Sequence, residues 1–392
     1  MSTRDSVVYV VPDKMGGMMR IIANLLAYRR PDDLRYHAVL TNNHLHTDTR
    51  FSAPLAADSQ TTVDYTLPLE NLHAVMRRVA RAIPGGGGVY VAGDLLDLAV
   101  ASRHDFGRAV VYMLHGDTEY YYDLAVKHDP IVHAFIAYSR QMYDELLARL
   151  PQRRETIFHL PYGIPLPQVA RRSAPGPLRA VYAGRFEQQQ KGIFDLPEID
   201  RALRARGVQV VWTMAGAGPD ENELKRRWAF NQAVRWLGTL TSSALIDEYA
   251  AQDVFVLPTR HEGFPVALLE AMGAGLVSVV SDIPSGVREV VDATTGLRAA
   301  VGDVSAYAGA IAALAGDRGR LEALSAAART VVATRFDIRD RVAEYQALYA
   351  RWREFYRPLA PGGHLQYGSR LDNPWIPNRV VRFVRTAIRA AR

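Results

Sequence analysis

The 392-residue sequence contains no cysteine. Disulfides, thiolate metal sites and cysteine nucleophiles are therefore excluded, and the composition is compatible with a reducing cytosol. No segment approaches the roughly 18 uninterrupted apolar residues that a membrane-spanning helix needs, and the N-terminus lacks the apolar core of a signal peptide. We therefore expect a cytoplasmic protein that does not span a bilayer.

The chain does have an ordinary hydrophobic content of 48% and an excess of positive charge, with a formal net charge of +6. Its length suggests two domains of roughly 100–200 residues each. The positive charge favours contact with an anionic partner such as nucleotide phosphates, anionic lipid or nucleic acid, and charge alone does not choose among these.

Short apolar runs alternate with helical patterns along the whole chain. The runs include Val7–Val11 and Ala109–Leu114 in the first half, and Leu178–Tyr182 after a proline-rich stretch, Pro161–Pro177, that we interpret as a linker. The alternation predicts two doubly wound α/β domains, each with a parallel sheet between layers of helices. Asp337–Phe355 predicts one long helix near the end. The predicted division is an N-terminal domain at 1–165, a C-terminal domain at 166–350 and a helical extension at 351–392.

The most informative segment is His261–Glu270, which follows the apolar run Val254–Leu257. A loop therefore opens at the carboxyl edge of a strand, where open α/β sheets bind ligands. A helix beginning just after this loop would direct backbone N–H groups near Gly263 at an anion. Glu262 and Glu270 could then meet the hydroxyls of a sugar ligand. The alternative is an ordinary helix start with two solvated acids.

A second segment strengthens this interpretation. Gly184 and Arg185 end a predicted strand, and Lys191 opens the next helix six residues later. Such a loop can cradle a diphosphate, because arginine offers a bidentate fork and lysine a mobile point charge. The alternative is a solvated basic loop.

Four motifs stand in a fixed order: Gly184-Arg185 with Lys191-Gly192, Ala215–Pro219, Val234–Gly238, and Glu262-x7-Glu270. Together they resemble the C-terminal domain of family-4 retaining glycosyltransferases of the GT-B fold, the glycosyl transferases group 1. The resemblance covers roughly residues 178–345. It extends more loosely into the first half, through Gly16-Gly17, His115-Gly116 and Pro161–Ile164.

The resemblance implies two Rossmann-like domains that face each other across a cleft, and it implies roles for the matching residues. Arg185 and Lys191 would bind the donor diphosphate and stabilise the leaving group, and Glu262 would contact the transferred sugar. His115 would face that sugar from the N-terminal domain, completing a catalytic set of His115, Glu262, Arg185 and Lys191. The implied donor-binding residues are Gly16, Gly17, Gly184, Arg185, Lys191, Arg235, Trp236, Leu237, Glu262, Gly263, Phe264, Pro265, Val266 and Glu270.

The expected activity is a retaining hexosyl transfer from a nucleotide-diphosphate sugar to a glycan or lipid-linked acceptor, in cell-surface polysaccharide biosynthesis. No cofactor or metal is expected, because the chain lacks the Asp-x-Asp motif of the metal-dependent transferases. Two mechanisms stay open: front-face transfer with the leaving phosphate as base, or Glu262 as a covalent nucleophile. The alternative functions are a GT-B phosphorylase or sugar-phosphate synthase, and a catalytically silent partner subunit.

The tail Asn373–Arg392 holds five arginines interleaved with apolar residues and contains no acid. As a helix it would be basic and amphipathic, suited to an anionic membrane surface on the inner face of the cell membrane. The alternative is a helix that packs on the N-terminal domain. Nucleic acid is not expected as a partner, because no recognised binding module accompanies the charges.

Overall fold

The structure is a computed structural model that describes residues 4–45, 50–51, 54–169, 171–172, 174–358 and 365–390. The chain forms two compact units. Unit 1 comprises residues 1–138, 143–160 and 341–392, and unit 2 comprises 139–142 and 161–340. The chain therefore passes into unit 2 after Leu160 and returns to unit 1 after Asp340, whereas the sequence analysis placed its boundaries at 165 and 350.

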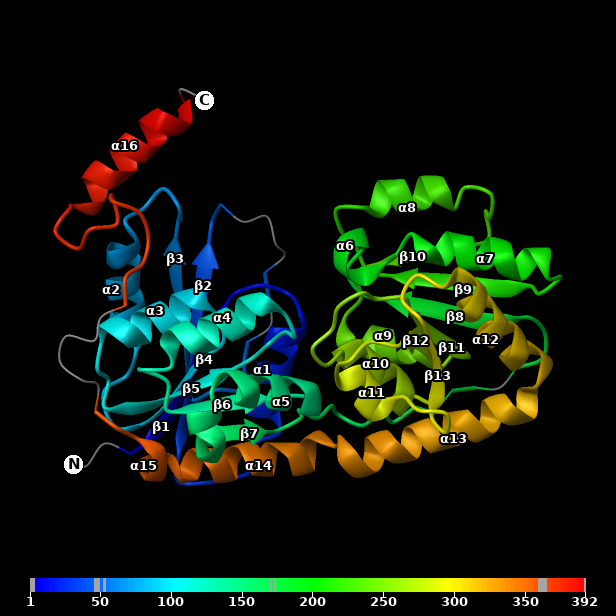
Figure 1. The fold of residues 1–392 in the computed structure, drawn as a ribbon, viewed down its shortest axis with the longest axis horizontal. Helices are drawn as coiled ribbons and strands as arrows, with labels where there is room; N and C mark the ends of the chain where they lie inside the picture. The colour runs from blue at the N-terminus through cyan, green and yellow to red at the C-terminus, as the bar shows by residue number, and fades with distance from the viewer. Residues whose placement is uncertain are drawn as a thin grey trace. The chain divides into compact units, whose positions relative to one another are not determined.

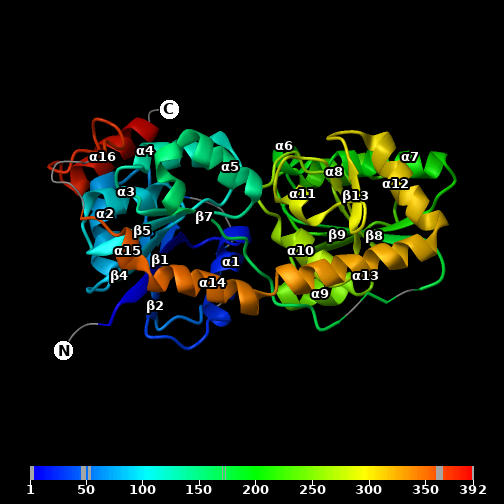
Figure 2. The same ribbon diagram turned by 60° about the horizontal axis from the view of Figure 1, so that its bottom comes forward.

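Unit 1 contains a seven-stranded sheet in the order β3-β2-β1-β4-β5-β6-β7, with every neighbouring pair parallel. Helices α1 (Gly17–Ala27) and α14 (Ile338–Ala350) lie on one side of the sheet, and α2 (Leu72–Ala82), α3 (Leu95–Arg103) and α4 (Glu119–His128) on the other (Figures 1 and 2). The strands are β1 (Ser6–Pro12), β2 (Arg35–Asn43), β3 (Ser59–Tyr65), β4 (Gly88–Ala92), β5 (Arg108–Met113), β6 (Ala134–Ala137) and β7 (Ile157–His159).

Unit 2 contains a six-stranded parallel sheet in the order β10-β9-β8-β11-β12-β13. Helices α7 (Asp195–Ala205) and α12 (Val304–Gly316) pack together on one side, and α9 (Ser242–Tyr249), α10 (Val266–Gly273) and α13 (Arg318–Arg335) lie on the other (Figure 2). The strands are β8 (Leu178–Ala183), β9 (Val210–Ala215), β10 (Arg235–Gly238), β11 (Val254–Leu257), β12 (Val277–Ser281) and β13 (Gly296–Ala299). The remaining short helices are α6 (Gln188–Lys191), α8 (Glu221–Arg227) and α11 (Gly286–Val290).

The central strands are apolar throughout because helices cover both faces of each sheet. Every residue of β4, β5, β11 and β12 is buried. The strands β5 and β11 are among the runs that the sequence pattern predicted, and the two-domain α/β architecture is confirmed.

The chain after Asp340 packs on unit 1 through aromatic side chains. Tyr345 Oη donates to the carbonyl of Leu160 at 2.7 Å, and the rings of Tyr349 and Tyr9 meet edge to face at 6.3 Å. The single helix predicted over Asp337–Phe355 is wrong in one respect. It ends at Ala350, and a separate turn, α15 (Trp352–Phe355), follows because the Arg351 N–H bonds the carbonyl three residues back, at Leu348, instead of four.

Three further elements belong mainly to unit 1. Helix α5 (Arg140–Arg149) and the short 3₁₀ helix η1 (Pro151–Thr156) connect β6 to β7, and α16 (Asn378–Ala390) ends the described chain. Arg392, the last arginine of the tail, lies outside the described residues.

Candidate functional site

The site in unit 2 begins where two glycine-containing loops approach each other. The N–H of Gly184, after β8, bonds the carbonyl of Ala215 at 3.0 Å, and the N–H of Gly216 bonds that of Gly238 at 2.7 Å. Gly216 has a φ of +142°, and a Cβ on it would lie 1.9 Å from the Gly184 carbonyl oxygen. Only glycine allows this contact, so the ends of β8, β9 and β10 are held close together at one edge of the sheet.

The centre of this edge is the point where the strand order reverses. β8 and β11 are neighbours, and the chain continues from them towards opposite sides of the sheet. Such a reversal leaves an opening at the carboxyl ends of the strands, where open α/β sheets bind ligands. The structure places Lys191, at the end of α6, and Glu262, in the loop after β11, at this point.

Lys191 and Glu262 form an ion pair, with Nζ 2.5 Å from Oε1. The lysine side chain is 18% exposed and the glutamate side chain 8%. The same carboxylate oxygen accepts from Thr259 Oγ1 at 3.1 Å. The pair joins the two predicted segments directly, which the sequence analysis did not anticipate. Thr259 was also missed, although its position two residues after a buried strand was a signal.

Close backbone contacts hold together the two segments that carry this ion pair. Gly192 ends α6 with a left-handed φ of +62°, and a Cβ there would lie 2.1 Å from the Pro258 carbonyl oxygen. The Arg260 N–H donates to the Gln190 carbonyl at 2.8 Å. α6 is therefore fixed against the loop after β11, so Lys191 and Glu262 hold their separation without a ligand.

Arg185 stands beside the pair in sequence but is exposed, and among the described residues no side chain or carbonyl engages its guanidinium. Its carbonyl accepts from the buried Tyr182 hydroxyl at 2.8 Å. Burial, followed by the charges of Glu262 and Glu187, holds the pKa of Tyr182 well above its usual value. The hydroxyl is therefore a permanent donor that fixes the backbone of Arg185 while its side chain stays available to an anion.

The loop before α10 is braced by aromatic packing. The ring of Phe264 meets that of Tyr162 edge to face at 5.2 Å and packs at a tilt against that of Phe336 at 5.5 Å. The Tyr162 hydroxyl donates to the Phe264 carbonyl. Gly263 accepts from the Gly286 N–H at 2.9 Å. α10 then starts at Val266 after Pro265, and Glu270 is buried one turn further on. The predicted donor residues of this segment thus share one rigid turn and helix start.

The β10 residues lie at the edge of the sheet. Arg235 is exposed and pairs with Glu248 at 2.9 Å, whereas Trp236 packs edge to face against Phe186 and Trp228, both at 6.1 Å. Leu237 is half-buried beside them. The guanidinium of Arg235 is therefore occupied, which leaves the main chain of this strand as the group able to meet a ligand, as the resemblance implies.

Unit 1 contains the other predicted residues. His115 follows β5, and its Nδ1 lies 3.1 Å from the Tyr138 hydroxyl. Burial lowers the pKa of His115 to about 3, so the imidazole is neutral near pH 7. A Cβ on Gly93 would lie 2.6 Å from His115 Nε2, which explains the glycine opposite the ring. Gly16 and Gly17 are exposed at the start of α1, and a Cβ on Gly16 would meet nothing within 4 Å.

The sequence analysis missed a buried acid, Asp97, which bonds the backbone of Gly93 opposite the His115 ring. Asp97 Oδ2 accepts from the N–H groups of Gly93 at 3.1 Å and Asp94 at 3.0 Å, in a capping box at the start of α3. Burial, and then the charge of Asp94, raises the pKa of Asp97 well above its usual value. The Asp-x-x-Asp spacing before an apolar run was the signal for this cap.

Within the described ranges, no group of three or more histidine, aspartate or glutamate side chains could hold a metal ion. No helix in the same part of the chain is both long and apolar enough to cross a bilayer.

Comparison with known proteins finds a family match within unit 2. Residues 177–317 match the family described as "Glycosyl transferases group 1". Most of unit 2 is therefore similar to a group 1 glycosyltransferase domain. The match spans the whole edge described above, from β8 and Lys191 to the helix that carries Glu270.

Two curated relatives illustrate the range of this similarity. The chain is 31% identical over 174 residues to a glycogen synthase of Mycobacterium tuberculosis, covering 44% of this chain and 42% of that protein. It thus spans less than half the length of that relative. It is 26% identical to the GDP-mannose:cellobiosyl-diphosphopolyprenol alpha-mannosyltransferase of Xanthomonas campestris, covering 77% of this chain and 84% of that protein.

The fold matches that of a solved structure over most of the chain. Anabaena HepE, solved with UDP and glucose, aligns with a TM-score of 0.70 at 17% identity, covering 88% of this chain and all of that one. Unit 2 is therefore one half of a GT-B architecture of two parallel-sheet α/β units.

Proposed function

We propose that this protein is a metal-independent, retaining hexosyltransferase that takes its sugar from a nucleotide-diphosphate donor. The observation that carries the proposal is the Lys191–Glu262 pair at the strand-order reversal of a group 1 domain, with the uncommitted Arg185 close by in the chain. Two cations and a helix start supply the charge that a diphosphate needs.

Each residue of the site has a separate role in the proposed reaction. Arg185 and Lys191 bind the diphosphate and stabilise the charge that develops on it as the glycosidic bond breaks. Glu262, held by Lys191 and Thr259, accepts hydrogen bonds from the transferred sugar. Both of those donors stabilise its carboxylate and so make it a poorer nucleophile, which favours front-face transfer with the leaving phosphate as base. His115, being neutral, orients the sugar through hydrogen bonds.

The proposed acceptor is a glycan or a lipid-linked saccharide on the cytoplasmic side of the membrane, in cell-surface polysaccharide assembly. The support comes from the Xanthomonas relative, whose name specifies a diphosphopolyprenol acceptor. A thermal-shift series with GDP, UDP, ADP and TDP identifies the donor base, because a ligand at 100 times its Kd stabilises the fold by about 2.7 kcal/mol.

The test is turnover of the nucleotide sugar that this series selects. Arg185→Ala should lower kcat by roughly 10²–10³-fold, as for other preorganised charge donors. Arg320→Ala, which removes an exposed arginine from the start of α13 in the same unit, is the matched control and should leave kcat unchanged. Equal turnover in a folded Arg185→Ala variant would refute the assignment. Release of nucleoside diphosphate, rather than uptake of inorganic phosphate, separates transfer from phosphorolysis.

A further inference from the structure

Helix α16 presents more apolar surface than unit 1 covers. Val381 faces the protein and is fully buried. Val380, Phe383 and Ala387, at spacings of three and four residues, form a neighbouring stripe that stays exposed, with Phe383 at 76%. Trp375, just before the helix, is 88% exposed. A soluble domain ordinarily buries such residues, so this stripe requires an explanation.

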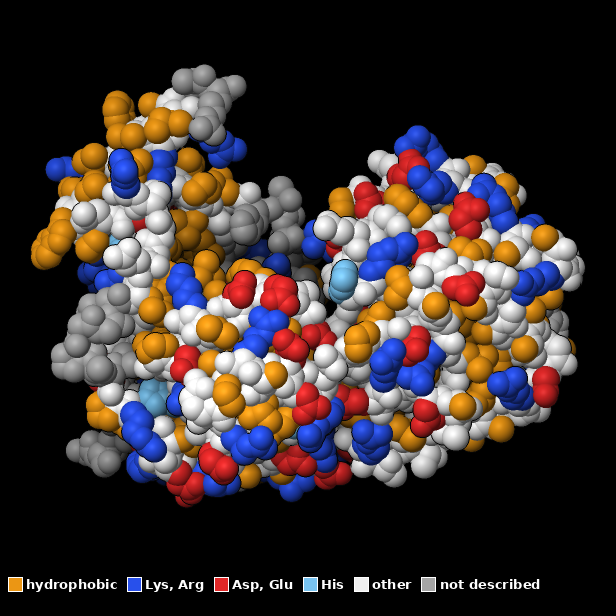
Figure 3. All heavy atoms as spheres, viewed as in Figure 1, with side chains coloured by type: hydrophobic (Ala, Val, Ile, Leu, Met, Phe, Trp, Pro, Cys, Tyr) orange, Lys and Arg blue, Asp and Glu red, His pale blue; other side chains and the backbone are white. Residues whose placement is uncertain are grey.

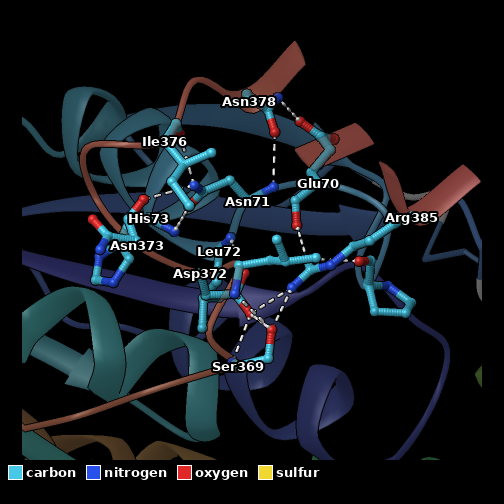
Figure 4. Close-up of polar contacts among 12 residues, drawn as sticks. Glu70, Asn71, Leu72, His73, Ser369, Asp372, Asn373, Ile376, Asn378 and Arg385 are labelled. Atoms are coloured by element: carbon cyan, nitrogen blue, oxygen red, sulfur yellow. Dashed lines mark hydrogen bonds and ion pairs between the residues drawn. The ribbon is translucent and has the colours of Figure 1, made fainter. Parts of the chain in front are cut away.

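A network of polar contacts holds the helix in this orientation (Figure 4). The Asn71 side chain donates to the carbonyls of Asn373 and Ile376, both at 2.9 Å, and its N–H donates to Asn378 Oδ1 at 2.7 Å. Arg385 donates to Asp372 Oδ2 at 2.7 Å and to the Glu70 carbonyl at 2.6 Å. We call these residues the latch. The outward stripe of α16 is therefore a fixed feature of unit 1.

The acids of the latch remain charged in neutral solution. Burial alone would raise the pKa of Glu70, but hydrogen bonds from Arg78, Asn378 and Thr66 outweigh it and lower the pKa to about 2. For Asp372, burial is likewise outweighed by Arg385 and by backbone N–H groups, and the pKa is about 2. Arg385 takes part in the latch, whereas Arg379, Arg382 and Arg389 of the same helix are exposed to solvent.

These other arginines lie to one side of the apolar stripe, beginning at Arg379. Arg379, Arg382 and Arg389 are exposed, and no residue from Asn373 to Arg392 is acidic. Figure 3 shows hydrophobic and Lys or Arg side chains side by side over α16 and the segment before it. The apolar surface continues from the exposed Ile388 into a hollow of about 1040 Å³ whose lining includes Leu69, Leu72 and Leu95.

We propose that α16, fixed by the latch, docks unit 1 on an anionic lipid bilayer. A helix with an exposed aromatic and aliphatic stripe next to a face of arginines has the composition of one that lies in the membrane interface, with its apolar side among the acyl chains and its cations at the headgroups. Trp375 is suited to the headgroup level. All charged side chains of α16 are positive, so they attract the negative phosphates of an anionic lipid surface. This proposal does not depend on the sugar-transfer activity proposed above.

The experiment is sedimentation of the full chain with vesicles of phosphatidylcholine containing 30% phosphatidylglycerol, at low salt. Arg379→Gln/Arg382→Gln should weaken partitioning by about 30-fold, since each arginine near an anionic surface contributes about a factor of five. Phe383→Ser should weaken it too. Arg226→Gln/Arg320→Gln, an equal loss of charge from exposed sites on unit 2, is the control and should retain most binding.

A positional readout distinguishes docking from a general loss of charge. Brominated lipids in the same vesicles should quench tryptophan fluorescence, and Trp375→Phe should remove most of that quenching while binding persists. A higher salt concentration should release the protein, because salt screens the attraction between the arginines and the lipid phosphates. Vesicles of pure phosphatidylcholine should not bind the protein, because they carry no net charge. Equal partitioning of the α16 and control variants would overturn the proposal, as would quenching that survives Trp375→Phe. Sugar transfer to a soluble acceptor should be unchanged in the α16 variants, which separates this proposal from the catalytic one.

Discussion

Replacing Glu262 by glutamine should tighten the binding of a nucleoside diphosphate while slowing sugar transfer. In the unliganded protein the Lys191 ammonium is already paired with the Glu262 carboxylate, at 2.5 Å. A bound diphosphate must share that ammonium with the carboxylate. Glu262→Gln removes the competing negative charge and preserves the shape of the side chain, so the lysine becomes fully available to phosphate.

The size of the effect follows from the geometry. Two anionic oxygens that share one ammonium lie about 5 Å apart, and they repel by about 3 kcal/mol at an effective dielectric of 20 and about 0.8 kcal/mol at 80. Because the Lys191 and Glu262 side chains are only 18% and 8% exposed, the repulsion lies towards the higher value. Relief of about 2–3 kcal/mol corresponds to roughly 30–150-fold tighter binding. Sugar transfer should nevertheless slow, because the sugar hydroxyls lose the charged carboxylate to which they donate hydrogen bonds.

Titration calorimetry with the preferred nucleoside diphosphate measures this directly. Lys191→Met should weaken binding by roughly 10–100-fold, as expected for loss of a charged hydrogen bond. The matched control is Glu198→Gln, another acid of unit 2 that pairs with a cation, Arg201, on the surface. If Glu262→Gln weakened binding as much as Lys191→Met does, the two side chains would not compete for phosphate and the reasoning would fail.

Two further predictions concern the framework of the site. Gly216→Ala should destabilise unit 2 by 2 kcal/mol or more in urea unfolding, on the order of strained and overpacked sites, because its Cβ would meet the Gly184 carbonyl at 1.9 Å; Gly207→Ala, also at positive φ but in open space, is the control and should cost less. The lowered pKa of His115 means that the unfolded chain binds more protons than the folded one between about pH 6.5 and 3. Stability should therefore fall as the pH drops through this range and be intact above it, and His115→Gln should flatten that dependence; an unchanged pH profile of thermal unfolding would contradict the buried, neutral imidazole.

The sequence pattern predicted the central strands because parallel strands covered on both faces must be apolar throughout. It missed β3, where only Val63 of seven residues is buried, because an edge strand carries little of that signal. The polar Ser59–Tyr65 run is held instead by seven paired positions with β2, and such pairing is invisible in a single sequence.

The site was predictable residue by residue but not as an arrangement. Arg185, Lys191 and Glu262 each stood beside an informative loop or helix start. The contact between Lys191 and Glu262, however, depends on β8 lying next to β11, although the two side chains are 71 positions apart in the chain. Neither local pattern specifies that order. The tail shows a similar limit: periodicity described an amphipathic helix, and only the latch contacts of Asn71 decided which side faces the protein.

The return of the chain after Asp340 has a consequence for how the protein is made. The backbone leading into unit 2 and the backbone leading out of it are paired, since the Ile164 N–H bonds the carbonyl of Phe336 and the Ile338 N–H bonds that of Ile164. The two ends of the segment 161–340, which makes up nearly all of unit 2, therefore meet. Because Tyr345 and Tyr349 follow this segment in the chain, the aromatic packing of unit 1 is completed only after unit 2 has been synthesised.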